Sequence, residues 1–391
     1  MRFPGFEDAW EVKKLGEVAT NFMYGMNTAA TVYDGENQYI RITDIDERTR
    51  LFTPNPLSSP DGELEDKYLL EKGDILFART GASVGKSYLY SEKDGKIFFA
   101  GFLIRLNVKT ENPYFIFSQT LTEKYQKWVL TMSMRSGQPG INAEEYKLLP
   151  IALPSFEEQS EIAFFLSKID ERIQTQSKII EQLETLIKGL SENLFSQKIR
   201  FKKFEKKWEV KTLGEILIEI NERTINSNQY RVLSSTAKGL FYQSDYFNKE
   251  VASKDNAGYK ILKINQLVFS PQNLWLGNIN VNTTYEIGIV SPSYKVFSFN
   301  EKAIVSYCKY FLKSSKMMFE YEQCSEQGAS IVRRNLNMDL FLNIPILLPK
   351  LEEQIQISSF LTKIDQKIQT EKAILEQLEI QKKYLLQQMF V

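Results

Sequence analysis

Two short segments of the sequence approach the spacing of known catalytic motifs, and neither completes one. A phosphate-binding P-loop needs Gly, four residues, and then Gly-Lys-Ser or Gly-Lys-Thr. Counting back from Gly85 places Thr80 where the first Gly should stand. The residues that follow, Tyr-Leu-Tyr, have a strand pattern, whereas a P-loop continues into a helix. The sequence therefore predicts no nucleotide hydrolysis at this loop.

The second segment, Asn-Pro-Tyr-Phe from Asn112, resembles the Asn/Asp-Pro-Pro-Tyr/Phe loop of amino-methyltransferases but lacks the second Pro. No Gly-rich loop after a strand accompanies it that could bind a methyl donor. The chain contains no His, which excludes Ser-His and Cys-His catalysis and most zinc hydrolase sites. We therefore expect a protein that is not an enzyme and has no cofactor of its own.

The loop at 79–86, which does not complete a P-loop, is better suited to binding a nucleic acid. Its two glycines permit close backbone approach, and its polar side chains suit contact with a nucleic-acid backbone or base edge. A hairpin turn with solvated ends is the alternative interpretation. A Gly-rich loop before Pro150 and the corresponding loops of the second half supply further candidates. The predicted DNA-binding residues are Arg79, Thr80, Ser83, Lys86, Arg135, Gln138, Asn142, Gln272, Asn273, Ser291, Tyr294, Lys295, Arg333, Arg334 and Asn337.

The overall charge gives no support to a nucleic-acid role. Basic and acidic residues number 49 each, so binding would depend on local patches or on a partner that brings positive charge. One basic run contains Lys198, Arg200, Lys202, Lys203, Lys206, Lys207 and Lys211, and a solvated face is the alternative to phosphate contact there. No apolar run reaches the roughly 18 residues of a membrane span, and the first residues lack a signal-peptide core, so we expect a cytoplasmic protein.

The elements that must position these loops are duplicated. The segment 150–195 returns without gaps as 345–390, about 195 residues later, with about half of the positions identical. A start segment, 2–18, also returns as 200–216. The stretches between start and end segments diverge, which predicts two domains of one fold that recognise different things.

Each repeated end segment predicts a long coiled-coil helix, because its apolar residues alternate steps of four and three. The seams are Ile162, Leu166, Ile169, Ile173, Gln176, Ile180, Leu183, Ile187, Leu190 and Leu194, and Ile357, Leu361, Ile364, Ile368, Glu371, Leu375, Leu378, Lys382, Leu385 and Met389. A helix of roughly 38 residues would be nearly 60 Å long, at about 1.5 Å per residue. One copy alone would suit any helical hairpin or homodimer zipper, but two copies can pack antiparallel, with pseudo-two-fold symmetry and one domain at each end.

The intervening stretches predict mixed α/β domains. In the first we expect a strand at 39–46, a helix at 63–70, a strand at 75–78 and a helix at 114–130. In the second, a strand at 260–270 replaces the strand at 75–78. The predicted fold class is α+β: two such domains separated by two long helices that form an antiparallel coiled coil.

These features together resemble the specificity subunit of type I restriction-modification systems. The resemblance rests on the paired Trp-Glu-Val-Lys-x-Leu-Gly-Glu starts at Trp10 and Trp208, on GDILFARTGASVGK at 73–86 and GIVSPSYKVF at 288–297, on the Pro-Ile-x-Leu-Pro approaches after Asn142 and Asn337, and on the Glu-Glu-Gln…Phe-Leu-x-Lys-Ile-Asp helices. It covers essentially the whole chain and is most specific in the helices.

The resemblance implies a subunit without catalysis of its own that binds double-stranded DNA as a bipartite target. Each target-recognition domain would recognise one half, and the helices would fix the gap. Two methyltransferase subunits would dock on it, with two restriction (motor) subunits in the full complex, and S-adenosylmethionine, ATP and Mg would belong to those partners. The expected ranges are 1–153 and 199–348 for the target-recognition domains and 154–198 and 349–391 for the conserved helices.

Two other classes of protein remain open. A free-standing scaffold with two peptide-binding domains would have the same helices, but it should bind neither DNA at moderate salt nor a methyltransferase. A self-sufficient methylating enzyme would need a complete donor loop and catalytic loop, and the sequence contains neither.

Overall fold

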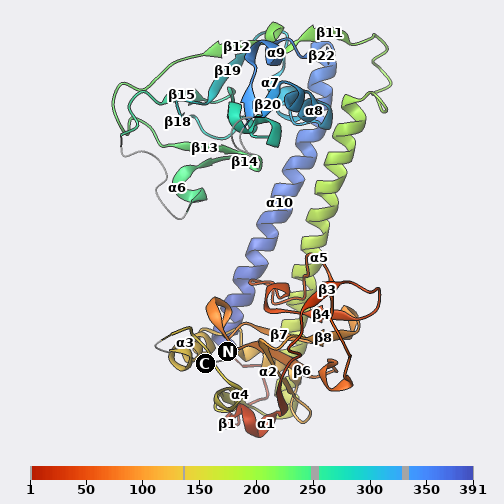
Figure 1. Cartoon of the computed structure of the whole chain (residues 1–391), viewed down its shortest axis with the longest axis vertical. Helices are drawn as coiled ribbons and strands as arrows, with labels where there is room; N and C mark the ends of the chain where they lie inside the picture. Colours follow the sequence, from red (N-terminus) through yellow and green to blue (C-terminus); the bar gives the residue numbers. More distant parts are fainter. Residues whose placement is uncertain (1, 135–136, 248–254, 328–333, 391) are drawn as a thin grey trace. The chain divides into compact units, whose positions relative to one another are not determined.

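The computed structural model describes residues 2–134, 137–247, 255–327 and 334–390. The chain forms two compact units (Figure 1). Unit 1 comprises Met1–Ser177 and Ala373–Val391, and unit 2 comprises Lys178–Lys372. None of the helices in the described residues combines the length and the apolar composition that a membrane span requires. Among the same residues, no group of three or more Cys, Asp or Glu residues could hold a metal ion.

Unit 1 is built around a four-stranded antiparallel sheet with the order β2-β9-β6-β7. Alternate residues of β6 point to opposite faces, so Ile75 and Phe77 join one apolar cluster while Leu76 and Ala78 join another. The elements are β1 Glu11–Lys14, α1 Leu15–Val18, β2 Thr20–Tyr24, β3 Ala30–Val32, β4 Gln38–Ile40, β5 Ser58–Pro60, β6 Asp74–Ala78, β7 Ser87–Leu89, β8 Ile97–Phe99, β9 Leu103–Asn107, α2 Pro113–Gln119, α3 Glu123–Ser133, α4 Ala143–Tyr146 and β10 Pro150–Leu153.

Unit 2 repeats this plan, with a four-stranded antiparallel sheet of order β12-β19-β16-β17. The elements are β11 Glu209–Thr212, β12 Leu217–Ile220, β13 Leu233–Thr236, β14 Gly239–Tyr242, α6 Gln243–Tyr246, β15 Lys260–Lys263, β16 Leu267–Phe269, β17 Ile279–Val281, β18 Ile287–Val290, β19 Lys295–Phe299, α7 Val305–Phe311, α8 Ser315–Gln323, β20 Ser325–Gln327, β21 Arg334–Leu336, α9 Met338–Leu342 and β22 Pro345–Leu348.

The two units share a topology but differ in detail. β1 pairs with β10 in unit 1 as β11 pairs with β22 in unit 2, always antiparallel. β8 pairs parallel with β4 and forms an antiparallel bridge at Leu69–Phe98, and β18 likewise pairs antiparallel with β15 and forms a parallel bridge at Val232–Ile289. Unit 2 also contains the hairpin β13–β14. The duplication predicted from the sequence therefore extends to the divergent stretches at the level of fold.

The predicted helices are confirmed as α5, Phe156–Phe195, and α10, Leu351–Met389. Every position of both predicted seams is buried or half-buried. In unit 1 the first turns of α5 share an apolar cluster with the end of α10, and Lys382 forms an ion pair with Asp170 at 2.6 Å. In unit 2 the end of α5 shares a cluster with the start of α10, and Lys372 pairs with Glu184 at 2.6 Å. The helices are thus packed antiparallel within each unit.

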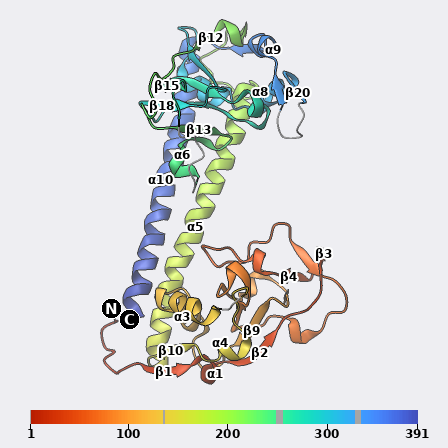
Figure 2. The same cartoon turned by 60° about the vertical axis from the view of Figure 1, so that its left-hand side comes forward.

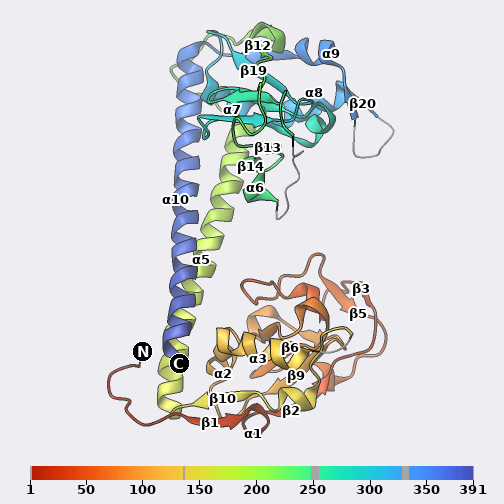
Figure 3. The same cartoon turned by 90° about the vertical axis from the view of Figure 1, so that its left-hand side faces the viewer.

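Each start segment packs on the helix that its own domain precedes. Arg2 donates two hydrogen bonds to Glu158, and Phe3 meets Phe165 edge-on with ring centroids 5.7 Å apart. In unit 2 Arg200 binds Glu353 and Phe201 meets Phe360 at 5.9 Å in the same way. β1 and β10 run side by side next to the first turn of α5 (Figures 2 and 3). In each unit the repeated start segment is therefore held against the helix by an ion pair and an aromatic contact, which together form a clamp.

Several short elements differ from the sequence predictions. The helix expected at 63–70 is only a 3-10 turn at Asp66–Tyr68, and the strand expected at 39–46 ends at Ile40 before a second such turn. The helix expected at 114–130 is split into α2 and α3, since Thr122 caps a new helix. The strand expected at 260–270 is two strands in different sheets, separated by Asn265 with a left-handed φ of 67°.

Candidate nucleic-acid interface

In unit 1 the structure brings together the two loops that contain the predicted binding residues. The Gly81 N–H donates to the Pro139 carbonyl at 3.0 Å, and the Ile141 N–H donates to the Arg79 carbonyl at 2.9 Å. Thr80 and Gly140 form an antiparallel bridge between the loops. Gly81 has φ +77°, and a Cβ there would lie 3.1 Å from the Gln138 amide nitrogen, so glycine suits both the turn and the close approach.

Arg79 lies against two exposed aromatic rings at this junction. Its guanidinium carbon is 4.8 Å from the centroid of Tyr24 and 5.8 Å from that of Phe102. Phe102 is 60% exposed and Tyr24 is 40% exposed, and within the described residues the buried Nε of Arg79 has no hydrogen-bond partner. Stacking on aromatic faces limits guanidinium motion and leaves its edge for hydrogen bonding.

Tyr24 and Phe102 were missed by the sequence analysis. Phe102 follows Ala100-Gly101 in the turn between β8 and β9, and the glycine in that apolar stretch was the available signal for a turn with an exposed tip. Tyr24 is the last residue of β2, and its hydroxyl accepts a hydrogen bond from the Ala143 N–H at 3.2 Å. The hydrogen bond between Tyr24 and Ala143 joins residues far apart in the sequence, so neither segment alone predicts it.

Lys86 is buried rather than available on the surface. Its side chain is 8% exposed, and Nζ donates to the carbonyl of Ile45 at 3.1 Å and pairs with Glu47 at 2.7 Å. Nζ also lies 3.5 Å from the Ile42 carbonyl. These contacts give Lys86 a role in holding segment 42–47 against the loop at 79–86.

The matched residues Asn142 and Asn337 both cap short helices. The Asn142 side chain accepts a hydrogen bond from the Glu145 N–H at 2.9 Å at the start of α4. Asn337 accepts from the N–H groups of Asp339 and Leu340, each at 3.1 Å, at the start of α9. Asparagine is among the preferred N-cap residues, which accounts for its presence at both positions.

Unit 2 places an arginine over an aromatic ring between the equivalent loops. Gln272 and Asn273 lie in the 3-10 helix η6, Pro271–Leu276, which follows β16 as the loop at 79–86 follows β6. Arg334, in β21, lies with its guanidinium carbon 4.1 Å from the Trp275 centroid and pairs with Glu322 at 3.1 Å. Both units thus place an arginine over an aromatic ring near these loops, but Arg79 follows β6 whereas Arg334 lies in β21.

The turn between β18 and β19 lies beside η6, because Lys295 pairs with Phe269 across the sheet. Lys295 Nζ forms an ion pair with Glu219 at 2.7 Å. Burial raises the pKa of the Tyr294 hydroxyl, which a hydrogen bond with Asn278 partly offsets. The Ser291 and Ser293 hydroxyls are 2.9 Å apart. Ser291 is therefore near the candidate surface, while Tyr294 and Lys295 already have partners.

The remaining predicted residues are less informative. Ser83 lies half-buried at the end of a 3-10 turn, Gly81–Ser83, and its carbonyl accepts from the Lys86 N–H at 3.0 Å. Arg135 and Arg333 lie outside the residues that the structure describes. In the basic run, Arg200 is held by Glu353 and Lys211 lies 3.7 Å from Glu209, while Lys198, Lys202, Lys203, Lys206 and Lys207 are exposed.

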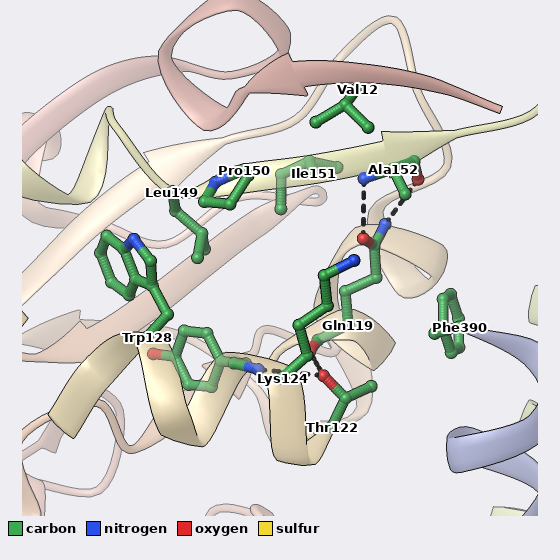
Figure 4. A pocket seen from close by; sticks show the side chains of 11 residues that line it. Val12, Gln119, Thr122, Lys124, Trp128, Leu149, Pro150, Ile151, Ala152 and Phe390 are labelled. Atoms are coloured by element: carbon green, nitrogen blue, oxygen red, sulfur yellow. Dashed lines mark hydrogen bonds between the residues drawn. The ribbon is translucent and has the colours of Figure 1, made fainter. Parts of the chain in front are cut away.

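Unit 1 also contains a small cavity, and one of its lining residues, Tyr125, donates a hydrogen bond to the Gly85 carbonyl at 2.8 Å. The cavity has a volume of about 50 Å³ and is lined by residues such as Trp128, Leu149 and Phe390 (Figure 4). Gln119 spans one side and makes two hydrogen bonds with the backbone of Ala152, each at 3.0 Å. Ligand pockets typically measure about 300 to 1,000 Å³, so this cavity is a packing gap rather than a cofactor site.

Comparison with known proteins identifies the class. A family model described as "Type I restriction modification DNA specificity domain" matches residues 7–185 and again residues 205–380. The MjaVIII specificity subunit of Methanocaldococcus jannaschii is 24% identical over 409 aligned positions, covering 96% of this chain and 91% of the relative. The putative MjaX specificity subunit of the same organism is 28% identical over 338 positions, covering 82% of this chain and 78% of the relative.

Two solved structures have the same fold. The S subunit from M. genitalium aligns with a TM-score of 0.58 and 16% identity over 100% of this chain and 97% of that one. A chain from a study of complex assembly and conformational transition of the type I R-M system aligns with a TM-score of 0.57 and 16% identity, covering 98% and 97%. The chain belongs to the family of DNA specificity subunits of type I restriction-modification systems. It is therefore the non-catalytic specificity component of such a complex.

Proposed function

We propose that this chain recognises a bipartite double-stranded DNA target, with one half read by the sheet domain of each unit and the gap set by α5 and α10. The observation that carries the proposal is an arginine over an aromatic ring in the loop region of each unit, Arg79 over Tyr24 and Phe102, and Arg334 over Trp275. Arginine donates bidentate hydrogen bonds to guanine or phosphate, which makes it the commonest specific reader of DNA.

The difference between the loops favours two unlike half-sites. Unit 1 offers Thr80, Ser83 and Gln138 around its arginine, while unit 2 offers Gln272, Asn273 and Ser291. Because base readout depends on which donors and acceptors reach the groove, these sets should not select the same sequence. We take the target-recognition domains as 1–153 and 199–348 and the conserved helices as 154–198 and 349–391.

The outer faces of the helices are suited to a partner that binds twice. An exposed apolar side chain recurs at one matched position, Ile179 in α5 and Ile374 in α10. Phe165 and Phe360, the other matched pair, already contact Phe3 and Phe201 of the start segments. We infer that two methyltransferase subunits dock here, with two restriction subunits joining the full complex, and that S-adenosylmethionine, ATP and Mg²⁺ are used by those partners.

The purified chain is expected to transfer no methyl group from S-adenosylmethionine to DNA and to hydrolyse no nucleotide. Methylation should appear when its cognate methyltransferase subunit is added, because that partner would supply the donor and adenine pockets. Radiolabelled methyl transfer to plasmid DNA measures this directly. Methylation by the chain alone, free of contaminating partner, would overturn the assignment, and so would a cognate partner that fails to bind it.

Replacing Arg79 with alanine is expected to weaken DNA binding of the methyltransferase complex by about 1 to 3 kcal/mol, mainly on targets with the correct first half-site. The reason is that the stacked guanidinium would contact the base edge or backbone of that half only. Binding to targets altered in the first or the second half, measured by fluorescence anisotropy at fixed salt, tests this.

Two control variants accompany that measurement. Lys109→Ala removes one exposed positive charge elsewhere in unit 1 and should leave affinity nearly unchanged. Lys86→Met should lower the unfolding temperature more than it lowers DNA affinity, since it deletes the buried contacts to Ile45 and Glu47. If Arg79→Ala lowers DNA affinity equally for targets with a correct and with an altered first half-site, Arg79 contacts only the DNA backbone.

A further inference from the structure

Unit 2 contains a cavity that the proposed reading of DNA does not use. Its volume is about 530 Å³, which is in the range of small-molecule sites, about 300 to 1,000 Å³. One wall comes from the second half of α5 with Ile187 and Ser191, and another from α10 with Gln369. The strands β14 and β17 and the junction between α7 and α8 complete it.

The lining of this cavity is rich in positive charge. Four lysines line it: Lys188, Lys238, Lys309 and Lys313. Its two carboxylates already have partners: Asp365 accepts from Lys309 at 2.8 Å and from Tyr310 at 2.7 Å, and Glu192 accepts from the Ser315 N–H and hydroxyl, both at 2.8 Å. Asp365 balances the charge of Lys309, and the other three lysines outnumber the single carboxylate of Glu192, so the lining carries a net positive charge.

Lys313 lines the cavity with a side chain that remains exposed. Its Nζ donates to the Asn280 side-chain oxygen at 2.7 Å, a neutral acceptor that does not balance its charge. The surrounding protein lowers its pKa by desolvation, and the charge of Lys309 lowers it further, although the side chain remains accessible through the cavity. A bound anion would offset both effects.

Ser314 adds an unused hydroxyl next to this amine. It is 3% exposed and lines the cavity, and its Oγ has no hydrogen-bond partner within the described residues. It occupies the N-cap position of α8 but does not cap that helix, whereas its counterpart Thr122 accepts from the Tyr125 N–H at the start of α3. A buried hydroxyl without a partner is unfavourable unless a ligand satisfies it.

Unit 1 lacks these features at the equivalent place. The residue before the cap there is Leu121, which packs against the apolar cluster of unit 1, where unit 2 has Lys313. The amine is therefore a difference between two copies of one fold and is not required by the fold.

We propose that this cavity in unit 2 is a phosphate-binding site in which the amines of Lys188, Lys238 and Lys313 and the hydroxyl of Ser314 receive the phosphate oxygens. Lysine ammonium groups and a hydroxyl donor are the common partners of phosphate in proteins. The phosphate comes either from a free phosphate compound or from the backbone of bound DNA. The inference is independent of the loops assigned to base readout.

The test uses the full chain bound to its methyltransferase subunits, with Lys313→Leu, which copies unit 1, and Ser314→Ala. Lys302→Ala, an exposed lysine of unit 2 outside the cavity, is the matched control. Pyrophosphate binding is measured by titration calorimetry without DNA, and affinity for DNA is measured over a series of salt concentrations. Thermal unfolding confirms that each variant is folded.

If the source is a free compound, pyrophosphate binds the unaltered complex, Lys313→Leu weakens it at least tenfold, and DNA affinity is unchanged. If the source is DNA, both cavity variants weaken binding to all sequences alike, and Lys313→Leu lowers the salt dependence by about one ion, as expected for a lost phosphate contact. The control should match the unaltered complex in either case. The absence of both effects in folded variants would overturn the proposal.

Discussion

Exchanging residues 19–149 for the corresponding segment of another specificity subunit is expected to change one half of the methylated sequence and leave the other half unchanged. The exchanged segment contains the loops around Arg79 and Gln138, but not β1, β10 or the clamp between Arg2 and Glu158. The incoming domain would therefore be held by the same pairing of strands and the same helix. Long-read methylation profiling of cells that carry the chimaera identifies the altered motif.

The matched control is the exchange of 217–344, which lies between β11 with the turn that follows it and β22 in unit 2. It should alter the other half of the motif and retain the first. If either exchange changed both halves in a folded complex that still methylates, the two domains would not be independent readers. The proposed division of labour would then be wrong.

The helices could be predicted closely because their signals are local. A seam such as Ile162, Leu166 and Ile169 depends only on the helical period, and its repetition in a second copy fixed the register. The polar positions Gln176 and Glu371 were predicted within the seam and are indeed buried. Lys367 pairs with Glu371 on the same helix, which helps to satisfy the buried charge there.

The sheets could be predicted only in part, because strand pairing depends on residues far apart in sequence. The apolar run at 260–270 gave no sign that its two halves belong to different sheets. The break is made by Asn265, whose N–H donates to the Asn282 carbonyl at 2.7 Å. Asparagine tolerates a left-handed conformation better than most residues, but its presence alone does not predict one.

The roles of side chains at the candidate site could also be predicted only in part. Lysine in a glycine-rich loop suits phosphate contact, yet Lys86 is buried against backbone carbonyls. Asparagine suits base readout, yet Asn142 and Asn337 cap helices. Residue type alone does not distinguish these roles, because the partners that decide them lie on other elements. The proximity of 79–86 and 137–142 was not predicted, because nothing in either loop's sequence indicates it.

Adding one heptad to each helix is expected to lengthen the preferred gap between the two half-sites by about two to four base pairs, because the added length of helix spans about that much DNA. The insertions fall between Leu183 and Leu190 and between Leu378 and Leu385, so both seams stay in phase. Seven residues add roughly 10 Å, comparable to about three base pairs at 3.4 Å each. Methylation should also weaken, because three base pairs rotate the duplex by about 100° and turn the second half-site away from its reader.

The measurement is methylation of a library in which two fixed half-sites are separated by every gap across a wide range, by complexes with the unaltered and the lengthened chain. The account predicts one preferred gap for each chain, a longer one for the lengthened chain, and identical half-site sequences for both. A lengthened chain that folds, binds its methyltransferase and keeps the original gap would show that α5 and α10 do not set the spacing, and the central claim would be contradicted.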